Sequence, residues 1–74
     1  MGRLRPLSGR EVIALLRARG FEEVRRRGSH VVMQKRLPDT TITVPVPDHK
    51  ELKAGTLRCI IRQSGLPRTL FEAQ

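Results

Sequence analysis

The sequence predicts a small α+β fold with the element order α-β-β-β-α. Two observations carry this prediction. Amphipathic segments with helix-ending signals stand near both ends of the chain, and three strand-like runs with short turns lie between them. Such a chain can bury both helical stripes by placing the two helices on one face of a three-stranded antiparallel sheet. With 74 residues, it is expected to form a single domain over residues 1–74.

The first helix is indicated by a capping signal near the N-terminus. Ser8 is followed three residues later by Glu11, which is the spacing of a capping box. Apolar residues then recur at helical spacing, at Val12, Ile13, Leu15 and Leu16. Gly20 stands where a glycine commonly ends a helix. The sequence therefore predicts a helix between Ser8 and Gly20.

Three strand-like runs follow, at residues 21–27, 30–36 and 41–47. Gly28 and Ser29 form a tight turn between the first two, and residues 37–40 contain the proline and aspartate that are typical of a second turn. Links this short predict an antiparallel meander. Because Pro45 cannot donate a hydrogen bond to a neighbouring strand, the end of the third strand is expected at an edge of the sheet or beyond the pairing.

The second helix is predicted after a loop at residues 48–55. Its apolar stripe consists of Leu57, Ile60 and Ile61. Gly65 is the expected C-terminal glycine, and Pro67 prevents continuation of the helix. The second helix is therefore expected to end just before Gly65.

Residues outside these patterns are also expected to be buried or structured. Phe21 and Phe71 lie in apolar contexts and are expected in the core. Cys59 stands beside two isoleucines, so a buried thiol without a disulfide is expected, as in a reducing cytosol. One further turn, capped by Thr69 and Glu72, is predicted after the second helix.

The charge balance indicates a polyanionic partner. Fifteen Lys and Arg against seven Asp and Glu give a net charge of +8, and residues 1–37 alone carry +7, ten basic minus three acidic side chains. A field of this strength favours nucleic acid, and arginine, which supplies twelve of the fifteen cations, suits phosphate. The chain has no Trp or Tyr. Binding of backbone phosphates is therefore expected rather than stacking of bases.

Composition also argues against several classes of protein. No apolar run approaches the length of a membrane span and no signal peptide is recognisable, so a cytoplasmic protein is expected. One cysteine and two histidines do not make a structural zinc site. A chain this short cannot enclose a large cofactor as well as a core. Neither a metal nor a cofactor is expected, and any site is expected to be a surface groove.

His30 is the candidate site residue, because it begins the second strand beside the densest positive charge in the chain. Alternation places it on the more polar face of that strand, which is expected to be left uncovered. Gly28 allows a positive φ or close approach of a ligand, and Ser29 is a compact donor, so both are expected to shape the turn. Arg25 and Arg27 share one face of the first strand. A histidine that only hydrogen-bonds locally at a hairpin turn would explain these residues as well.

The alternative is that this histidine performs chemistry on RNA. RNA carries its own nucleophile, the 2′-hydroxyl, and histidine suits the task of removing its proton near neutral pH. The pentavalent phosphorane gains negative charge, which guanidinium groups and backbone amides can stabilise. The candidate phosphate ligands are Arg25 and Arg27 with Lys35 or Arg36. Such a mechanism needs no metal.

The sequence does not clearly indicate which residue is the general acid that protonates the leaving 5′-oxygen. His49 is a candidate if the loop before the second helix folds toward the turn; the alternatives are a solvated loop histidine, or His30 acting in both directions. Lys50, Lys53 and the backbone around Thr56 form a second candidate anion site, since they precede a helix whose N-terminus attracts phosphate. A plain capping role explains Thr56 equally well.

Two stretches of the chain resemble a known family. The sequence G-S-H at residues 28–30, joined to T-V-P-V-P-D-H-K-E-L-K-A-G-T-L-R-C-I-I-R-Q-S-G-L at residues 43–66, is similar to the HicA toxins. These are small mRNA interferases of HicA–HicB toxin–antitoxin modules. The resemblance covers nearly the whole chain. Ala54 stands where family chains often have Pro, a departure that is expected to matter little.

The resemblance implies a double-stranded-RNA-binding-domain-like fold, in agreement with the α-β-β-β-α order. It implies that His30 is catalytic, that mRNA is cleaved without a metal, that translation is inhibited and that a HicB antitoxin covers the site. The +8 surface would suit an acidic antitoxin, because complementary charge speeds association. The alternatives are a non-catalytic double-stranded-RNA-binding protein of the same fold, or an adaptor whose only partner is another protein.

Overall fold

The computed structural model describes residues 3–72. In chain order its elements are α1 (Gly9–Ala18), β1 (Glu22–Arg27), β2 (His30–Arg36), β3 (Thr41–Pro47), α2 (Ala54–Ser64) and a short 3-10 helix, η1 (Arg68–Phe71). The predicted α-β-β-β-α order is confirmed, and the first strand begins one residue later than expected. Within residues 3–72, neither α-helix has the length and hydropathy that crossing a membrane would require.

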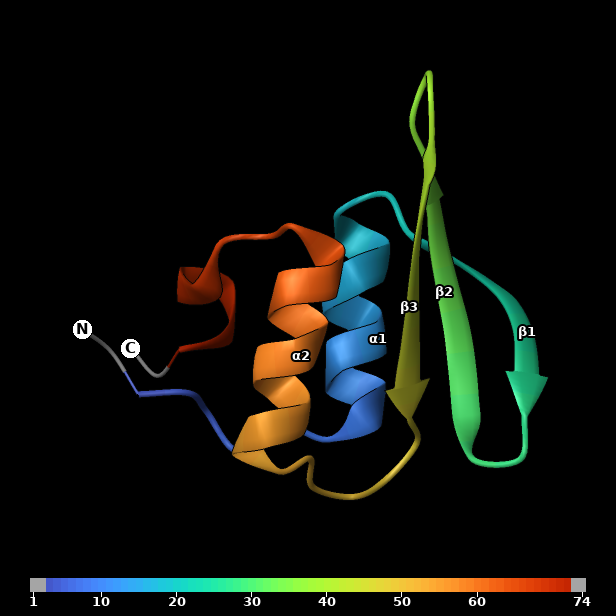
Figure 1. Ribbon diagram of the computed structural model, residues 1–74. Helices are drawn as coiled ribbons and strands as arrows, with labels where there is room; N and C mark the ends of the chain where they lie inside the picture. The colour runs from blue at the N-terminus through green and yellow to red at the C-terminus, as the bar shows by residue number, and fades with distance from the viewer. Residues whose placement is uncertain (1–2, 73–74) are drawn as a thin grey trace.

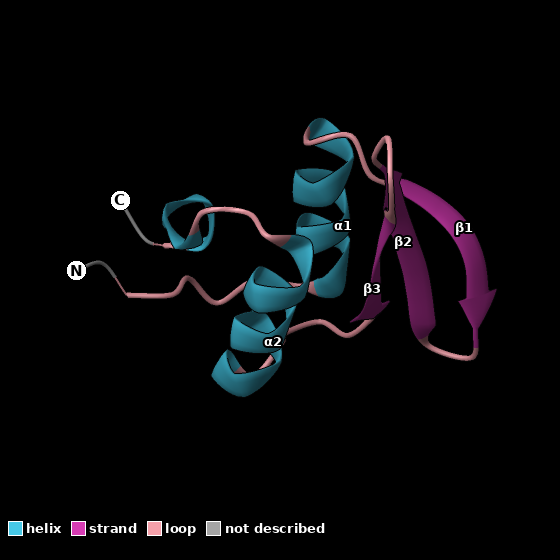
Figure 2. Ribbon diagram, turned by 45° about the horizontal axis from the view of Figure 1, so that its top comes forward, coloured by secondary structure: helices cyan, strands magenta, loops and turns pink. Residues whose placement is uncertain are grey.

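The three strands form one antiparallel sheet in the order β1-β2-β3, so β3 is an edge strand, as Pro45 predicted. Both helices lie on one side of the sheet, and β1 is the strand farthest from them (Figure 1). The turned view shows the same two layers (Figure 2). We call the face without helices the open face; the strand register assigns to it Glu22, Arg25, Arg27, His30, Val32, Gln34, Arg36, Thr41, Thr43, Pro45 and Pro47.

The core lies between the helices and the other face of the sheet. Alternate strand residues enter it and are fully buried, namely Val31, Met33, Val44 and Val46. The helices contribute apolar side chains from one stripe each, including Val12, Leu16, Leu57 and Ile60. Phe21 and Phe71 are also buried, as predicted. Burial of these stripes against one sheet face is what fixes the open face as the exposed one.

The predicted capping box is present at the start of α1. The Glu11 N–H donates to Ser8 Oγ at 3.1 Å, and the Ser8 N–H donates to Glu11 Oε1 at 2.9 Å. The backbone hydrogen bond from Ser8, and then the bond with its hydroxyl, favour the ionised carboxylate and hold the pKa of Glu11 below its ordinary value. The helix ends at Ala18, with Gly20 just beyond it at a φ of 95°.

The lowered pKa predicts a specific acid dependence of stability. The carboxylate contributes stability above its ordinary pKa of about 4.5, and this contribution is lost as pH falls through the lower folded-state value. Glu11→Gln keeps a side-chain acceptor for the Ser8 N–H but does not titrate. We therefore expect the loss of melting temperature between pH values of about 6 and about 3 to be smaller in Glu11→Gln than in the wild type. Thermal unfolding monitored by circular dichroism measures the melting temperature of both proteins across this pH range. An equal loss of melting temperature in the two proteins would contradict a contribution from ionised Glu11.

Helix α2 differs from the prediction at its start and on its surface. It begins at Ala54, so the last two residues assigned to the loop are helical. It ends at Ser64, as predicted, and is followed by the C-cap Gly65, whose φ is 71° and whose N–H donates to the Ile61 carbonyl at 3.1 Å. The expectation of a buried Cys59 thiol is wrong, because this side chain is exposed. Cys59 is two positions, or about 200°, from the buried Leu57. Adjacency to isoleucines in sequence therefore did not place it on their face.

The C-terminal segment packs back on the N-terminal one. The Arg5 N–H donates to the Phe71 carbonyl at 2.8 Å, and the two ends of the described chain lie close together (Figure 1). The further turn was predicted correctly as η1, but its capping by Thr69 and Glu72 was wrong. Its N-cap is Pro67, with no side-chain capping bond, and the Glu72 carboxylate instead accepts from Arg68 Nε at 2.9 Å.

Candidate nucleic-acid interface

The turn between β1 and β2 presents His30 at one end of the open face. Gly28 has a φ of 58°, and Ser29 has a negative φ, since no non-glycine residue in the described chain has a positive one. These signs are those of a type II′ hairpin turn, which favours glycine at its first central position. The predicted role of Gly28 in shaping the turn thus has a conformational basis. His30 follows at once and is exposed.

The strand register surrounds His30 with defined neighbours. It pairs with Arg27 on β1 and with Pro47 on β3, so these three residues form a row across the sheet. The next row on the same face is Arg25, Val32 and Pro45. Side chains of directly opposed residues in an antiparallel sheet lie on one face about 5 Å apart at Cβ. The imidazole therefore has an arginine beside it in its own row and another in the next.

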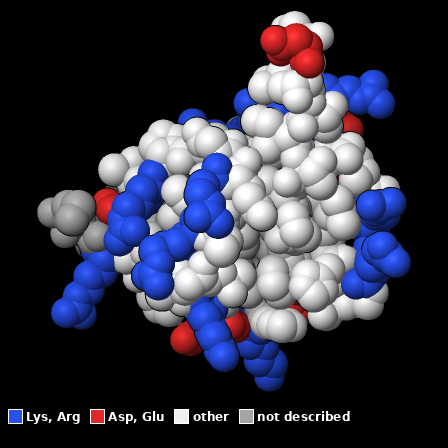
Figure 3. Space-filling view, in the orientation of Figure 1, with Lys and Arg blue, Asp and Glu red and all other residues white. Residues whose placement is uncertain are grey.

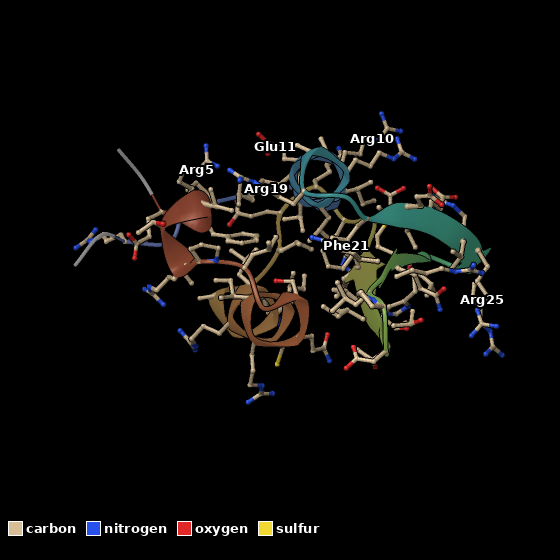
Figure 4. All side chains as sticks on the ribbon, turned by 90° about the horizontal axis from the view of Figure 1, so that it is seen from above. Arg5, Arg10, Glu11, Arg19, Phe21 and Arg25 are labelled. Atoms are coloured by element: carbon tan, nitrogen blue, oxygen red, sulfur yellow. The ribbon has the colours of Figure 1, made fainter. Side chains whose placement is uncertain are left out.

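The three consecutive arginines have different surroundings. Arg25 extends from β1 away from both helices, whereas Phe21 lies between α1 and the sheet (Figure 4). Arg26 has the opposite orientation in the register and pairs with Asp48, Nη1 to Oδ2 at 3.2 Å. Within residues 3–72, neither Arg25 nor Arg27 forms an ion pair. Two guanidinium groups on the open face are thus unneutralised, and the third is held on the other side.

The loop after β3 folds against the turn, as the hypothesis for His49 required. The Asp48 N–H donates to the Ser29 carbonyl at 2.7 Å, and the His49 carbonyl accepts from the Gly9 N–H at 2.8 Å. Asp48 therefore contacts the turn through its backbone and β1 through its carboxylate. His30 directly follows Ser29 and His49 directly follows Asp48, so both histidines adjoin this contact in the chain.

The His49 side chain lines a surface hollow at the start of α1. The other lining residues are Ser8, Arg10, Asp48 and Lys50. Lys50 thus lines the same hollow as His49, whereas Lys53 and Thr56 are not among its lining residues. Arg10, which points outward from α1 (Figure 4), was not among the predicted site residues. No local motif marks Arg10 or Asp48, because each reaches the site through a contact between segments far apart in sequence.

The remaining predicted phosphate ligands are dispersed over the surface. Lys35 is on the covered side of β2, with Nζ 6.0 Å from the centre of the Phe21 ring. Arg36 shares the open face with His30, but at the opposite end of β2. Lys53 is the N-cap of α2, has no side-chain capping bond, and precedes the half-buried Thr56. Only Arg25 and Arg27 accompany His30 in its own and the adjacent row.

Basic side chains lie on several parts of the visible surface (Figure 3). Lys and Arg gather along β1 and over α2, with a largely uncharged surface between them (Figure 3). The exposed arginines of α2 are Arg58 and Arg62. In residues 3–72, no group of three or more His, Cys, Asp or Glu side chains could hold a metal ion. The arrangement around His30 is suited to binding an anion and transferring a proton beside it.

Comparison with known proteins identifies the family. The model of the HicA toxin of bacterial toxin–antitoxin systems matches residues 9–66. The chain belongs to the HicA toxin family. The match begins at the first residue of α1 and runs through α2, so it includes the β1–β2 turn, His30 and His49. A search of curated proteins found none that matches the chain.

Membership in this family assigns the chain the role of a toxin in a toxin–antitoxin system. It also implies a HicB antitoxin as the partner in the module. The resemblance stated from residues 28–30 and 43–66 is thereby confirmed at the level of the family. The α-β-β-β-α architecture expected for it is the one observed.

Proposed function

We propose that this HicA toxin is an endoribonuclease that cleaves mRNA with His30 as its catalytic residue. The observation that carries the proposal is the row formed by Arg27 and His30 at the turn of the open face, with Arg25 in the next row. An exposed imidazole thus stands on the open face beside two β1 cations that have no acidic partner in the described chain. Cleavage of mRNA would account for the toxicity through inhibition of translation and would place the activity in the cytoplasm.

The proposed reaction is a transesterification within the RNA. His30 removes the proton of the 2′-hydroxyl, the 2′-oxygen forms a bond to the adjacent phosphorus, and the bond from phosphorus to the 5′-oxygen breaks. The products are a 2′,3′-cyclic phosphate and a 5′-hydroxyl. The bond that forms and the bond that breaks both lie within the RNA, so this step needs neither a water nucleophile nor a metal, and His30 holds the proton taken from the 2′-hydroxyl.

The leaving 5′-oxygen must accept a proton. In-line attack places the 2′-oxygen and the 5′-oxygen on opposite sides of phosphorus, so a donor other than the base is favoured. His49 is the candidate, because its loop is bonded to the Ser29 carbonyl and lies at the same end of the sheet as His30. Arg25 and Arg27 would bind the phosphate and stabilise the charge that it gains in the transition state. Gly28 and Ser29 would hold the turn in the conformation that presents His30.

The test of this function is cleavage of a long mRNA by the purified toxin in the presence of EDTA. We expect chelator-resistant cleavage that leaves 2′,3′-cyclic phosphate and 5′-hydroxyl ends, as detected by end-specific ligation and sequencing. Ends with a 5′-phosphate would indicate hydrolysis by a different mechanism. Binding of the RNA without any cleavage would favour the non-catalytic alternative.

The open-face arginines should carry a measurable share of RNA affinity. We expect the Arg25→Gln, Arg27→Gln double variant to bind RNA more weakly and to lower the slope of log affinity against log salt by about 1.4, since roughly 0.7 is lost for each phosphate contact to a single strand. The matched control is Arg58→Gln, Arg62→Gln, which removes the same charge from α2. Fluorescence anisotropy over a salt series measures both. Equal slopes for the two double variants would tell against these arginines as the contact surface.

A further inference from the structure

A second hollow lies on the open face at the end opposite His30. It has a volume of about 520 Å³ and is lined by Gly20, Glu22, Val24, Gln34 and Arg36. Glu22 and Gln34 are register partners on neighbouring strands, and Arg36 follows two residues later on the same face. Side chains from the outer strand β1 and the central strand β2 therefore meet here. None of these five residues is used by the proposed reaction.

The polar groups of this hollow are mixed in kind and available for binding. Gln34 Nε2 donates to Thr43 Oγ1 at 3.2 Å, which fixes the amide and leaves its carbonyl oxygen as an acceptor. Within residues 3–72, neither Glu22 nor Arg36 takes part in an ion pair. A carboxylate, an amide oxygen and a guanidinium thus present acceptors and donors to the same space. Such a set matches a ligand that carries both.

A break in the β1–β2 pairing gives the hollow an apolar wall. The register shifts between Glu23 and Arg25, so Val24 has no partner on β2. Bulges of this kind turn a side chain out of the regular alternation. Val24 is 48% exposed and lines the hollow, although a β-branched aliphatic side chain gains nothing from contact with water. It can instead contact the flat face of a ring.

The charge of Glu22 decides which part of an RNA chain would fit. A carboxylate repels phosphate, so this hollow is not suited to the backbone, unlike the surroundings of Arg25 and Arg27. Carboxylates and amide oxygens do accept hydrogen bonds from base N–H groups, and arginine donates to paired acceptors on guanine. Guanine is the base that presents two acceptors, O6 and N7, on one edge and N–H donors on another.

We propose that the hollow lined by Glu22, Val24, Gln34 and Arg36 binds a guanine base of the RNA and gives this toxin a sequence preference. The inference rests on the proposed function in that RNA is taken to be the substrate. Arg36 would donate to O6 and N7, Glu22 would accept from the base N–H groups, and Val24 would contact the ring.

The geometry also places this base relative to the cleaved bond. Gln34 is four residues from His30 along β2, which corresponds to about 13 Å at the rise of an antiparallel strand. Between them lies the row of Arg25, Val32 and Pro45, in which Val32 is only 8% exposed. The bound guanine is therefore separated from the scissile phosphate, and the intervening RNA lies across this row.

Binding can be measured without cleavage in the His30→Ala background. The probes are short oligouridylates that carry one central guanosine, adenosine or cytidine, or none, and the readout is fluorescence anisotropy. We expect the guanosine probe to bind about fivefold tighter or more than the other three. Adding Glu22→Gln and Arg36→Gln should bring this ratio close to unity. The matched control, Glu51→Gln with Arg58→Gln, makes the same charge changes on exposed residues outside the open face and should keep the ratio.

The outcomes separate this proposal from the proposed function. Equal binding of the four probes, tighter binding of a base other than guanine, or a guanine preference that survives Glu22→Gln with Arg36→Gln would each overturn the base site. None of these outcomes depends on whether the wild-type protein cleaves RNA. If the wild type cleaves mRNA but the four probes bind equally, the proposed nuclease function would be supported and only the proposed guanine site would be refuted.

Discussion

His30→Ala is expected to lower the rate of RNA cleavage by about a hundredfold to ten-thousandfold, the range that a positioned general base contributes. RNA affinity should change little, because the arginines of β1 remain in place. Since His30 is exposed, its removal leaves no cavity in the core and the melting temperature should stay within a few degrees of that of the wild type. Single-turnover cleavage, anisotropy and thermal unfolding measure the three quantities on the same preparation.

His49→Ala is the natural companion to this variant. If His49 donates the proton to the 5′-oxygen, its loss lowers the cleavage rate on an ordinary RNA but much less on a substrate whose leaving group needs no proton, such as a nitrophenyl ester of a nucleoside 3′-phosphate. His30→Ala should be slow on both substrates. Cleavage by His30→Ala at the wild-type rate would show that His30 is not the catalytic residue and that the active site lies elsewhere. Binding without cleavage by every protein would support the double-stranded-RNA-binding alternative.

Much of the fold could be predicted from local sequence, because the signals that begin and end its helices and strands are local. The capping box of Ser8 and Glu11, the left-handed Gly65 and the turn at Gly28 each act within a few residues of chain. Residues alternate strictly in β3, so that Val44 and Val46 are fully buried while Thr43 and Pro45 are exposed. In a strand such as β3, the face of the sheet to which a side chain points depends only on its position in the strand.

The errors arose where a residue's surroundings depend on rotation about a helix or on tertiary contact. Cys59 was assigned to the core by its isoleucine neighbours, but helical rotation turns it to the surface. Glu72 was given a capping role by its spacing from Thr69, yet its carboxylate accepts from Arg68. In both cases a sequence spacing was compatible with two geometries, and packing selected the other one.

In the candidate site, too, some features could be predicted from local sequence, whereas others depend on tertiary contacts. That Arg25 and Arg27 share a face followed from alternation, and the strand register then shows that His30 lies on the same face. The pairing of Arg26 with Asp48 could not be predicted, since 22 residues separate them and the β1–β2 hairpin must first fold against the loop after β3. The same holds for the hollow beside Gln34, which needs the bulge at Val24 as well as the strand register.

Gly9→Ala is expected to destabilise the protein by about 3 kcal/mol, at the upper end of what overpacking commonly costs. A Cβ on Gly9 would overlap the Pro47 carbonyl oxygen and would lie 2.9 Å from the Asp48 Cα, and both are backbone atoms that no rotamer change can move. For a domain of this size the melting temperature should fall by more than about 10 °C. Denaturant titration and thermal unfolding measure the loss of stability.

Gly55→Ala is the matched control, because it makes the same substitution in a helix where a Cβ would meet nothing within 4 Å. It should raise stability by about 0.5–1 kcal/mol, since alanine loses less conformational freedom than glycine in a helix. The backbone that Gly9→Ala displaces carries the Asp48 N–H that bonds to the Ser29 carbonyl. Cleavage should therefore fall in Gly9→Ala even under conditions where it remains folded, and stay unchanged in Gly55→Ala. A folded Gly9→Ala variant with wild-type cleavage would show that the turn holds His30 in place without support from this loop.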